Sequence, residues 1–246
     1  MENSTYIALS RMDAQQRAMS VVADNMSNAS TVGYKRENVL FSDYLSRQHG
    51  STQPTGAETQ AYTQDRATYR DFQQGDMQQT GNPLDLALGG EGYFQVQTAN
   101  GVRLTRAGRF EKQQDGTVVD ESGNALLDRE GQPIVLPATD HQLTISSDGV
   151  ISTETGEAGQ IGIVTARDNN TLQAEGSHLL RSDQPTDAVD RPSILQGMVE
   201  GSNVQMMSEV TKMMDIQRNF DFMAQFVNAE ATRQQNAIDK IVQVSA

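Results

Sequence analysis

The 246-residue chain contains no cysteine and no tryptophan, and only 5% of its residues are aromatic. Without cysteine it can form no disulfide, thiolate nucleophile or sulfur-ligated metal site. No stretch approaches the roughly 20 apolar residues of a membrane-spanning helix, so we expect no membrane insertion. The mean hydropathy is -0.56, and such a chain has little material for a hydrophobic core. Part of the structure is therefore expected to depend on assembly.

Basic residues are also scarce, with 19 Lys and Arg against 32 Asp and Glu and a net charge of -13. This balance argues against a nucleic acid as partner, because a phosphate backbone binds basic surfaces. The first thirty residues lack the basic start and apolar run of a secretory signal. Their polar positions Asp13, Arg17 and Asp24 are not predominantly basic, which disfavours the alternative of a membrane-surface helix.

Candidate catalytic chemistry is sparse. The three histidines, His49, His141 and His178, stand far apart and lack a second ligand at metal-binding spacing. The glycines of residues 89–92 precede strand-like residues rather than a helix, so they predict a tight turn and not a phosphate loop. No nucleophile-elbow pattern supports a Ser-His-Asp site, although one sequence leaves that alternative open. We predict no catalytic residue, no cofactor and no metal site.

The longest regular pattern lies at the end of the chain, from Asn203 to Ser245. Apolar or small residues recur there at alternating spacings of three and four, which is the heptad pattern of a helix with a narrow apolar face. A helix of this length measures about 65 Å, longer than one ordinary globular domain covers. It therefore needs partners, or else it is the core helix of a self-contained bundle.

The first thirty residues repeat this spacing with good helix-forming residues, so we predict a helix from about Ser4 to Ala29. A cluster of Ser, Asn and Thr before Gly33 ends it. The matching seams predict an antiparallel, coiled-coil-like pair of long terminal helices. The predicted assembly interface consists of the seam residues Met12, Met19, Val22, Met26, Val210, Met213, Phe220, Val227, Ile238 and Ile241.

Between the two predicted helices, the sequence pattern indicates mainly β-strands. Short alternating runs are separated by turn dipeptides, namely Asn100-Gly101, Asp115-Gly116, Ser122-Gly123, Glu130-Gly131 and Asp148-Gly149, which predict hairpins. Residues 46–61 are polar and predict a flexible arm, and residues 62–72 an extended piece.

The predicted fold class is α+β, with the helix pair flanking a central, mainly-β domain of short hairpins. The predicted segments are 1–42 (N-terminal helix and turn), 43–75 (extended arm or linker), 76–192 (β-rich domain) and 193–246 (linker and C-terminal helix).

Three motifs in order resemble those of flagellar rod and hook proteins. They are ALSRMDAQQRAMSVVADNMSNASTVGYKRENVLF (8–41), TGNPLDLALGGEGYFQV with LTRAGRF (80–96 and 104–110), and EGSNVQMMSEVTKMMDIQRNF (200–220). Within that family, the proximal-rod subunits are the most similar in length and in the run before residue 88. A distal-rod or hook-type subunit is the runner-up. The N-terminal turn motif that carries the first resemblance comprises Asn25, Asn28, Gly33, Tyr34 and Lys35.

The resemblance implies a structural subunit of the axle of the bacterial flagellum, in the basal body that spans the periplasm. Its partners would be neighbouring rod subunits, including copies of itself, and the flagellar type III export apparatus that exports it unfolded. The terminal helices would form the inner helical layer, and we expect them to be unordered in the free subunit. An extracytoplasmic binding or hydrolytic module built on the β-domain is the alternative from a different class, and a pocket with converging polar groups would favour it.

Overall fold

The computed structural model describes residues 2–48, 58–137, 143–176 and 178–244. The chain divides into two compact units, which we name by their composition. The terminal unit comprises Met1–Ser27, Glu37–Arg70 and Gln205–Ala246, and the central unit comprises Asn28–Arg36 and Asp71–Val204. The turn that follows the N-terminal helix thus belongs to the central unit. The predicted division into four segments stays a prediction.

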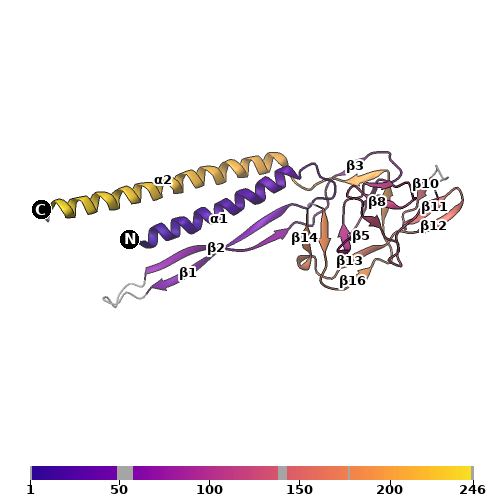
Figure 1. The fold of residues 1–246 in the computed structure, drawn as a ribbon, viewed down its shortest axis with the longest axis horizontal. Coiled ribbons are helices and arrows are strands. Elements are labelled where there is room, and N and C mark those ends of the chain that lie inside the picture. The colour runs from indigo at the N-terminus through magenta and orange to yellow at the C-terminus, as the bar shows by residue number, and fades with distance from the viewer. Residues whose placement is uncertain (1, 49–57, 138–142, 177, 245–246) are drawn as a thin grey trace. The chain divides into compact units, whose positions relative to one another are not determined.

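The terminal unit contains a helix from each end of the chain and a long hairpin (Figure 1). Helix α1 spans Glu2–Ser27 and α2 spans Met206–Val244. Strands β1 (Glu37–Gln48) and β2 (Glu58–Arg70) pair antiparallel. Helix α1 contacts α2 and both strands, and it lies between α2 and the β1–β2 hairpin. Neither helix has glycine or proline in its interior, and no helix of the described residues is long and apolar enough to cross a membrane.

The predicted fold class, with its antiparallel, coiled-coil-like helix pair, was wrong. The N- and C-terminal helices themselves are present, but α1 also packs on the β1–β2 hairpin, which the prediction treated as arm and linker. Along the described part of α2, no side chain after Glu209 is buried. Knobs-into-holes packing buries the seam residues of both helices, so the structure supports a three-element layer and not a coiled coil.

The hairpin arises in residues that the composition made look flexible. Backbone pairing runs from Glu37 opposite Arg70 to Gln48 opposite Glu58, with a register shift between Leu40 and Phe41. The extended piece predicted for residues 62–72 is confirmed over most of its length by β2. Residues 49–57 of the predicted arm lie outside the described residues. Neither strand shows a regular alternation of apolar and polar residues, so the sequence pattern did not indicate their pairing.

The central unit is built from short strands. They are β3 (Met77–Gln79), β4 (Leu86–Leu88), β5 (Tyr93–Thr98), β6 (Gly101–Thr105), β7 (Phe110–Lys112), β8 (Val118–Asp120), β9 (Ala125–Leu126), β10 (Leu143–Ile145), β11 (Val150–Thr153), β12 (Gly156–Gln160), β13 (Ile163–Ala166), β14 (Gln173–Glu175), β15 (Leu179–Arg181), β16 (Thr186–Ala188), β17 (Ile194–Gln196) and β18 (Met198–Glu200). A 3₁₀ turn at Asn169–Thr171 precedes β14. Each predicted turn dipeptide follows a strand. Four of the five join consecutive paired strands in hairpins, and Glu130-Gly131 joins the bridge partners Leu127 and Pro133.

Pairing in the central unit is not limited to neighbours in the sequence. The largest sheet runs β14-β15-β6-β5-β9-β8-β7, with β13 also paired to β5 and β16 paired to β13. Strands β17 and β18 return to pair with β4 and β3. The description as short hairpins therefore covers only part of the domain, because these pairs join residues more than a hundred positions apart.

A closed hydrophobic core fills the central unit. Phe94 and Phe110 are both 0% exposed, and their rings meet edge to face with centroids 5.4 Å apart. Leu86, Val96 and Leu126 are buried in the same cluster. Full burial of such side chains is worth about 1.5–3 kcal/mol each, so the central unit holds the material of an independent fold.

Candidate functional site

The predicted seam residues lie along the two helices of the terminal unit. Val22 is buried, with 6% of its surface exposed. The partly buried members are Met12, Met19, Met26, Val210, Met213, Phe220 and Val227. The side chains of Ile238 and Ile241 lie outside the described residues. Each described seam residue except Val22 thus keeps part of its apolar surface open.

A second set of apolar side chains on α2 escaped the sequence analysis. Met207, Met214, Phe222 and Phe226 are exposed by 79%, 47%, 66% and 43%. They do not belong to the seam, and the heptad search passed over them because it followed a single stripe. The signal that could have found them is the seven-residue spacing of Met207 and Met214 beside two phenylalanines in a polar helix.

Asn25 joins α1 to the first residue of β1. Its side-chain nitrogen Nδ2 donates to the Glu37 carbonyl oxygen at 2.8 Å, and the Glu37 amide donates to Asn25 Oδ1 at 2.9 Å. Asn25 is 1% exposed, so these bonds also satisfy a buried amide. The same nitrogen lies 3.5 Å from Glu209 Oε2 on α2. One side chain of the predicted motif therefore meets all three parts of the terminal unit.

Glu209 is the buried charge of this junction. It lies in the first turn of α2 and is 1% exposed. Lys212, one turn later, donates from Nζ to Glu209 Oε1 at 2.9 Å. A carboxylate at this position also interacts favourably with the positive end of the helix dipole. The start of α2 is thereby anchored before its exposed length begins.

Gly33 forms the turn of the motif within the central unit. Its φ is +71°, and a Cβ atom there would lie 2.3 Å from the Ala107 amide nitrogen. Its own amide donates to the Glu200 carbonyl oxygen at 2.8 Å. Both the left-handed backbone and the close approach require glycine. Asn28 accepts a bond from the Thr31 amide at 3.1 Å, which tightens the preceding turn.

Lys35 ends in a buried ion cluster that we call the Glu200 centre. Its Nζ donates to Glu200 Oε1 at 2.5 Å and to the Gln73 carbonyl oxygen at 2.7 Å. Arg106 Nη1 donates to Glu200 Oε2 at 3.1 Å, and the Gly75 amide donates to Oε1 at 3.0 Å. Glu200 is 0% and Lys35 3% exposed. Three donors thus surround one carboxylate that is shielded from water.

The electrostatics of this cluster follow from its burial. Burial lowers the pKa of Lys35, although the hydrogen bond and the charge of Glu200 act in the opposite direction. The Arg106 guanidinium also lies 5.3 Å from the centroid of the Tyr93 ring, in a cation–π contact. Burial raises the pKa of Tyr93 to about 12. These contacts hold the groups in place.

Asn203 closes the same region through the backbone. Its Oδ1 accepts from the Arg36 amide at 2.7 Å, and its Nδ2 donates to the carbonyl oxygens of Asp71 at 2.8 Å and Gln73 at 3.0 Å. The segments 33–36, 71–75 and 200–203 are thereby tied together from three distant parts of the chain. Of the predicted turn motif, Gly33, Tyr34 and Lys35 are buried here, and Asn25 lies in the terminal unit.

Sequence reasoning missed Glu200, Arg106, Asn203 and Glu209. A motif search noted the stretch from Glu200 onward but assigned it no charge partner. The available signal was a glutamate between the apolar Val199 and Gly201, opposite a lysine that follows Gly33-Tyr34. A buried acid of this kind requires a cation, but the sequence does not say which one.

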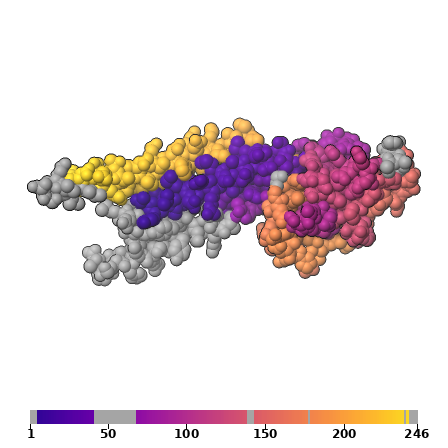
Figure 2. Space-filling view, in the orientation of Figure 1, coloured from indigo at the N-terminus to yellow at the C-terminus, as the bar shows by residue number. Residues whose placement is uncertain are grey.

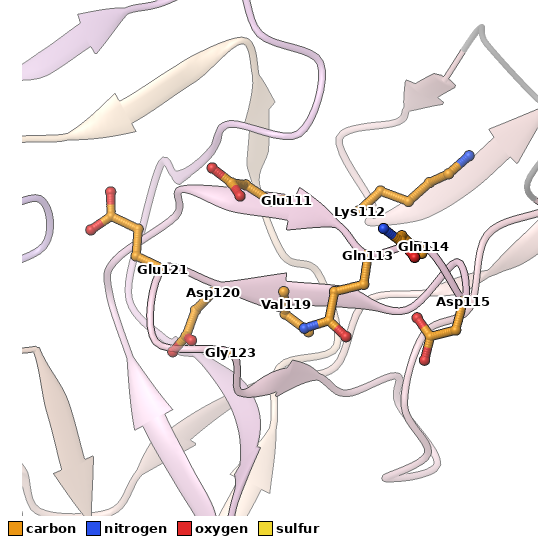
Figure 3. A pocket seen from close by; sticks show the side chains of 9 residues that line it. All are labelled: Glu111, Lys112, Gln113, Gln114, Asp115, Val119, Asp120, Glu121 and Gly123. Atoms are coloured by element: carbon orange, nitrogen blue, oxygen red, sulfur yellow. The ribbon is translucent and has the colours of Figure 1, made fainter.

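A hollow of about 640 Å³ on the central unit tests the alternative of a binding or hydrolytic module (Figure 3). It is lined by residues on and around β7 and β8, four of them acidic. Asp120 accepts from the amides of Ser122 and Asn124, and Asp115 accepts from the Thr117 amide. Glu121 and Lys112 point away from each other. Two of the four carboxylates, those of Asp115 and Asp120, thus cap their own turns, and Glu121 pairs with Arg109.

Comparison with protein families gives three matches along the chain. Residues 6–35 match the model described as flagella basal body rod protein. Residues 87–153 match the flagellar hook protein FlgE/F/G D1 domain, and residues 195–240 match the flagellar basal body rod FlgEFG protein C-terminal. The three matches fall on α1 with the Gly33 turn, on the central unit, and on β17, β18 and most of α2.

Characterised relatives match over nearly the whole chain. The flagellar basal-body rod protein FlgF of Caulobacter vibrioides is 32% identical over 247 residues, covering 100% of both chains. FlgF of Mesorhizobium japonicum is 31% identical, covering 97% of each chain. The flagellar basal-body rod protein FlgG of Bacillus subtilis is 33% identical, covering 89% of this chain and 92% of its own.

Proposed function

The chain belongs to the flagellar basal-body rod proteins and is a structural subunit of that rod, and we propose that it polymerises through its terminal unit. It resembles the members named FlgF over its full length. It is located in the flagellar basal body, and it assembles with other flagellar rod and hook subunits.

Incomplete burial of the terminal unit is the observation that carries this proposal. The central unit has a closed core with Phe94 and Phe110 at 0% exposure, whereas α2 has no described buried side chain after Glu209. A helix that exposes methionine and phenylalanine along its length gains free energy when a neighbour covers them. We propose that the ten predicted seam residues complete their burial in this way, against other rod subunits and against copies of this chain.

The subunit carries load between neighbours as part of an axle that transmits torque. The Glu200 centre and Asn203 support this role, because they hold the Gly33 turn in one conformation within the central unit. Asn25 and Glu209 do the same at the base of the terminal unit. Buried polar groups that are paired in this way specify one geometry, which suits a subunit that transmits force.

The proposed function also includes the route by which the chain is exported and its lack of catalytic activity. The chain reaches the periplasm unfolded through the flagellar type III apparatus, and the absence of cysteine is compatible with that route because no disulfide can form on the way. It binds no nucleic acid, inserts into no membrane and catalyses no reaction. Asp115 and Asp120 in the hollow at β7 and β8, whose carboxylates cap their own turns, support the last statement.

Placement as a distal-rod or hook-type subunit is the second candidate. The 33% identity to the Bacillus subtilis FlgG supports it. A strain lacking FlgF but retaining FlgG separates the two, because only a proximal subunit of the FlgF type restores motility there when this chain is expressed.

The polymerisation proposal is tested by placing a charge on the seam. Met213→Asp or Phe220→Asp is expected to abolish motility in a complemented strain, because an aspartate cannot be buried against an apolar neighbour. Asn219→Asp, at an exposed position beside them, is the matched control and is expected to swim normally. Normal motility of both seam variants, with the purified proteins folded, contradicts the proposal.

A further inference from the structure

Helix α2 has two apolar faces, and the structure covers one of them. At about 100° per residue, Val210, Met213, Phe220 and Val227 occupy one side of the helix. The exposed residues Met207, Met214, Phe222 and Phe226 fall on the other side, within a sector of about 120°. A subunit that met its neighbours through the seam alone would need only the first face.

The second face changes character along the helix. After Phe226 it continues into a hollow of about 570 Å³ lined by Ala229, Thr232, Arg233, Asn236, Ala237 and Lys240. All six are exposed and belong to α2. Small residues form the floor, and two cations form the rim. Arg233 bonds to Glu230 but remains 63% exposed at its side chain. We call this the α2 hollow.

Length places the α2 hollow beyond what α1 of the same chain covers. Helix α2 has 39 residues and α1 has 26. Within the terminal unit, the C-terminal end of α2 extends past the N-terminus of α1 (Figure 1), and its side chains stand open in the space-filling view (Figure 2).

The first half of α1 carries a surface that fits the α2 hollow. Tyr6 and Leu9 are 60% and 58% exposed. Asp13 follows on the same stripe; it lies 3.9 Å from Arg17 Nε in an exposed ion pair, and its side chain remains 69% exposed. Bulky apolar side chains match a floor of small residues, since small residues let helices approach closely. The exposed acid matches the cationic rim.

We propose that Tyr6, Leu9 and Asp13 of one copy dock into the α2 hollow of a second copy of this chain. In a parallel register, the offsets of three and four residues from Tyr6 to Leu9 to Asp13 equal those from Arg233 to Asn236 to Lys240. Tyr6 then lies over Arg233, Leu9 over the alanine floor, and Asp13 reaches Lys240. The contact joins two different surfaces, so it propagates from copy to copy and does not close on a dimer. This inference rests on the proposed rod function and names one of its interfaces.

Charge reversal tests the pairing in the full-length purified protein. Asp13→Lys and Lys240→Asp are each expected to weaken concentration-dependent self-association on the order of tenfold, because each places like charges in contact. The double variant restores the pair in every interface and is expected to recover most of the loss. Sedimentation velocity over a concentration series gives the measurement. A double variant no better than the singles, or a wild type that stays monomeric throughout, overturns the inference.

Cysteine cross-linking gives a second readout without a native thiol in the way. Two proteins are mixed, one with Leu9→Cys and the other with Asn236→Cys, and a mixed disulfide is expected to dominate. Leu9→Cys mixed with Asn219→Cys is the matched control, because residue 219 lies outside the α2 hollow. Equal cross-linking of both mixtures overturns the inference. The two proposals can fail separately. If the seam variants lose motility while the charge-reversal variants swim normally and the cysteine pair forms no cross-link, the rod function is supported and only this interface is excluded.

Discussion

The two units of this chain differ in how completely they bury their side chains. The central unit buries Phe94, Phe110 and the Glu200 centre, and the Glu200 carboxylate finds its donors within one chain. In the terminal unit, buried groups gather at Asn25 and Glu209 at the base, together with a few small or β-branched positions of α1, while methionines and phenylalanines of α2 stay open. The central unit completes its burial within one chain, whereas the terminal unit, on our proposal, completes its burial against neighbouring subunits.

The difference shows where a polymerising subunit keeps its stability. Apolar burial in the central unit can balance the entropy of ordering its chain. The terminal unit orders more than sixty helical residues with little buried surface, so its helices gain most from contacts with other subunits.

Truncation of one phenylalanine in each unit sharpens this comparison most. Phe94→Ala is expected to cost about 3–5 kcal/mol of central-unit stability, because it leaves a cavity in a closed core. Phe220→Ala removes a side chain that is only partly buried, so it is expected to cost less than about 1.5 kcal/mol in the free chain. Urea unfolding followed by hydrogen exchange resolves the two units. Equal losses from both changes would contradict the division.

Removal of the buried charge is the next largest effect. Glu200→Gln leaves Lys35 and Arg106 without their counter-charge, and we expect a loss of about 3 kcal/mol. The control is Glu121→Gln, which breaks the exposed pair with Arg109 (side chains 56% and 46% exposed) and should cost about 0–1 kcal/mol. Both are measured by urea unfolding of the central unit. Equal losses of stability in the two variants would contradict a stabilising role for the buried ion pairs of the Glu200 centre.

Gly33→Ala probes the turn that belongs to the central unit. The alanine Cβ would meet the Ala107 amide nitrogen at 2.3 Å on a backbone with φ of +71°, so we expect a loss of about 1–3 kcal/mol. The matched control is Gly81→Ala, which also has a positive φ of +77° but no atom within 4 Å. The difference in melting temperature between the variants isolates the close approach. A larger loss for Gly81→Ala would refute this assignment.

Acidification is expected to change the stability of the central unit least, through the carboxyl group of Asp120. Burial acts to raise the pKa of Asp120, but hydrogen bonds from His178, Asn124 and Ser122 outweigh it and hold the pKa below the usual 3.8. Because the folded-state pKa is lower than the unfolded one, this group stabilises the fold fully above pH 3.8. That contribution is lost as the pH falls further through the lowered pKa.

The matched variant is Asp120→Asn, whose difference from wild type in urea midpoint is expected to shrink below pH 3.8. A difference that grows on acidification would carry the wrong sign and contradict the assignment.

Sequence patterns predicted the features that local chemistry determines. The helix at each end, the hairpin turns and the requirement for Gly33 follow from residue spacing, turn dipeptides and the backbone needs of glycine. The terminal helices were placed within a few residues of their bounds. Family resemblance, carried by three motifs, supplied the function.

Long-range pairing could not be predicted. The β1–β2 hairpin lacks a hydrophobic alternation, and β17 and β18 return to strands more than a hundred residues away. Partners of buried charges are equally hidden, since Glu200, Lys35 and Arg106 meet only after the fold has formed. The second apolar face of α2 was in the sequence, but a search for one seam does not find two.

Hydrogen exchange on the purified full-length monomer tests the central claim most directly. Fast exchange over α1 and α2, with strong protection in β5, β6, β8 and the turn around Gly33, is the predicted result. Polymerisation should then protect both helices. Helices that are as strongly protected in the monomer as the central sheet would show that the terminal unit is complete in a single chain, and would contradict the account.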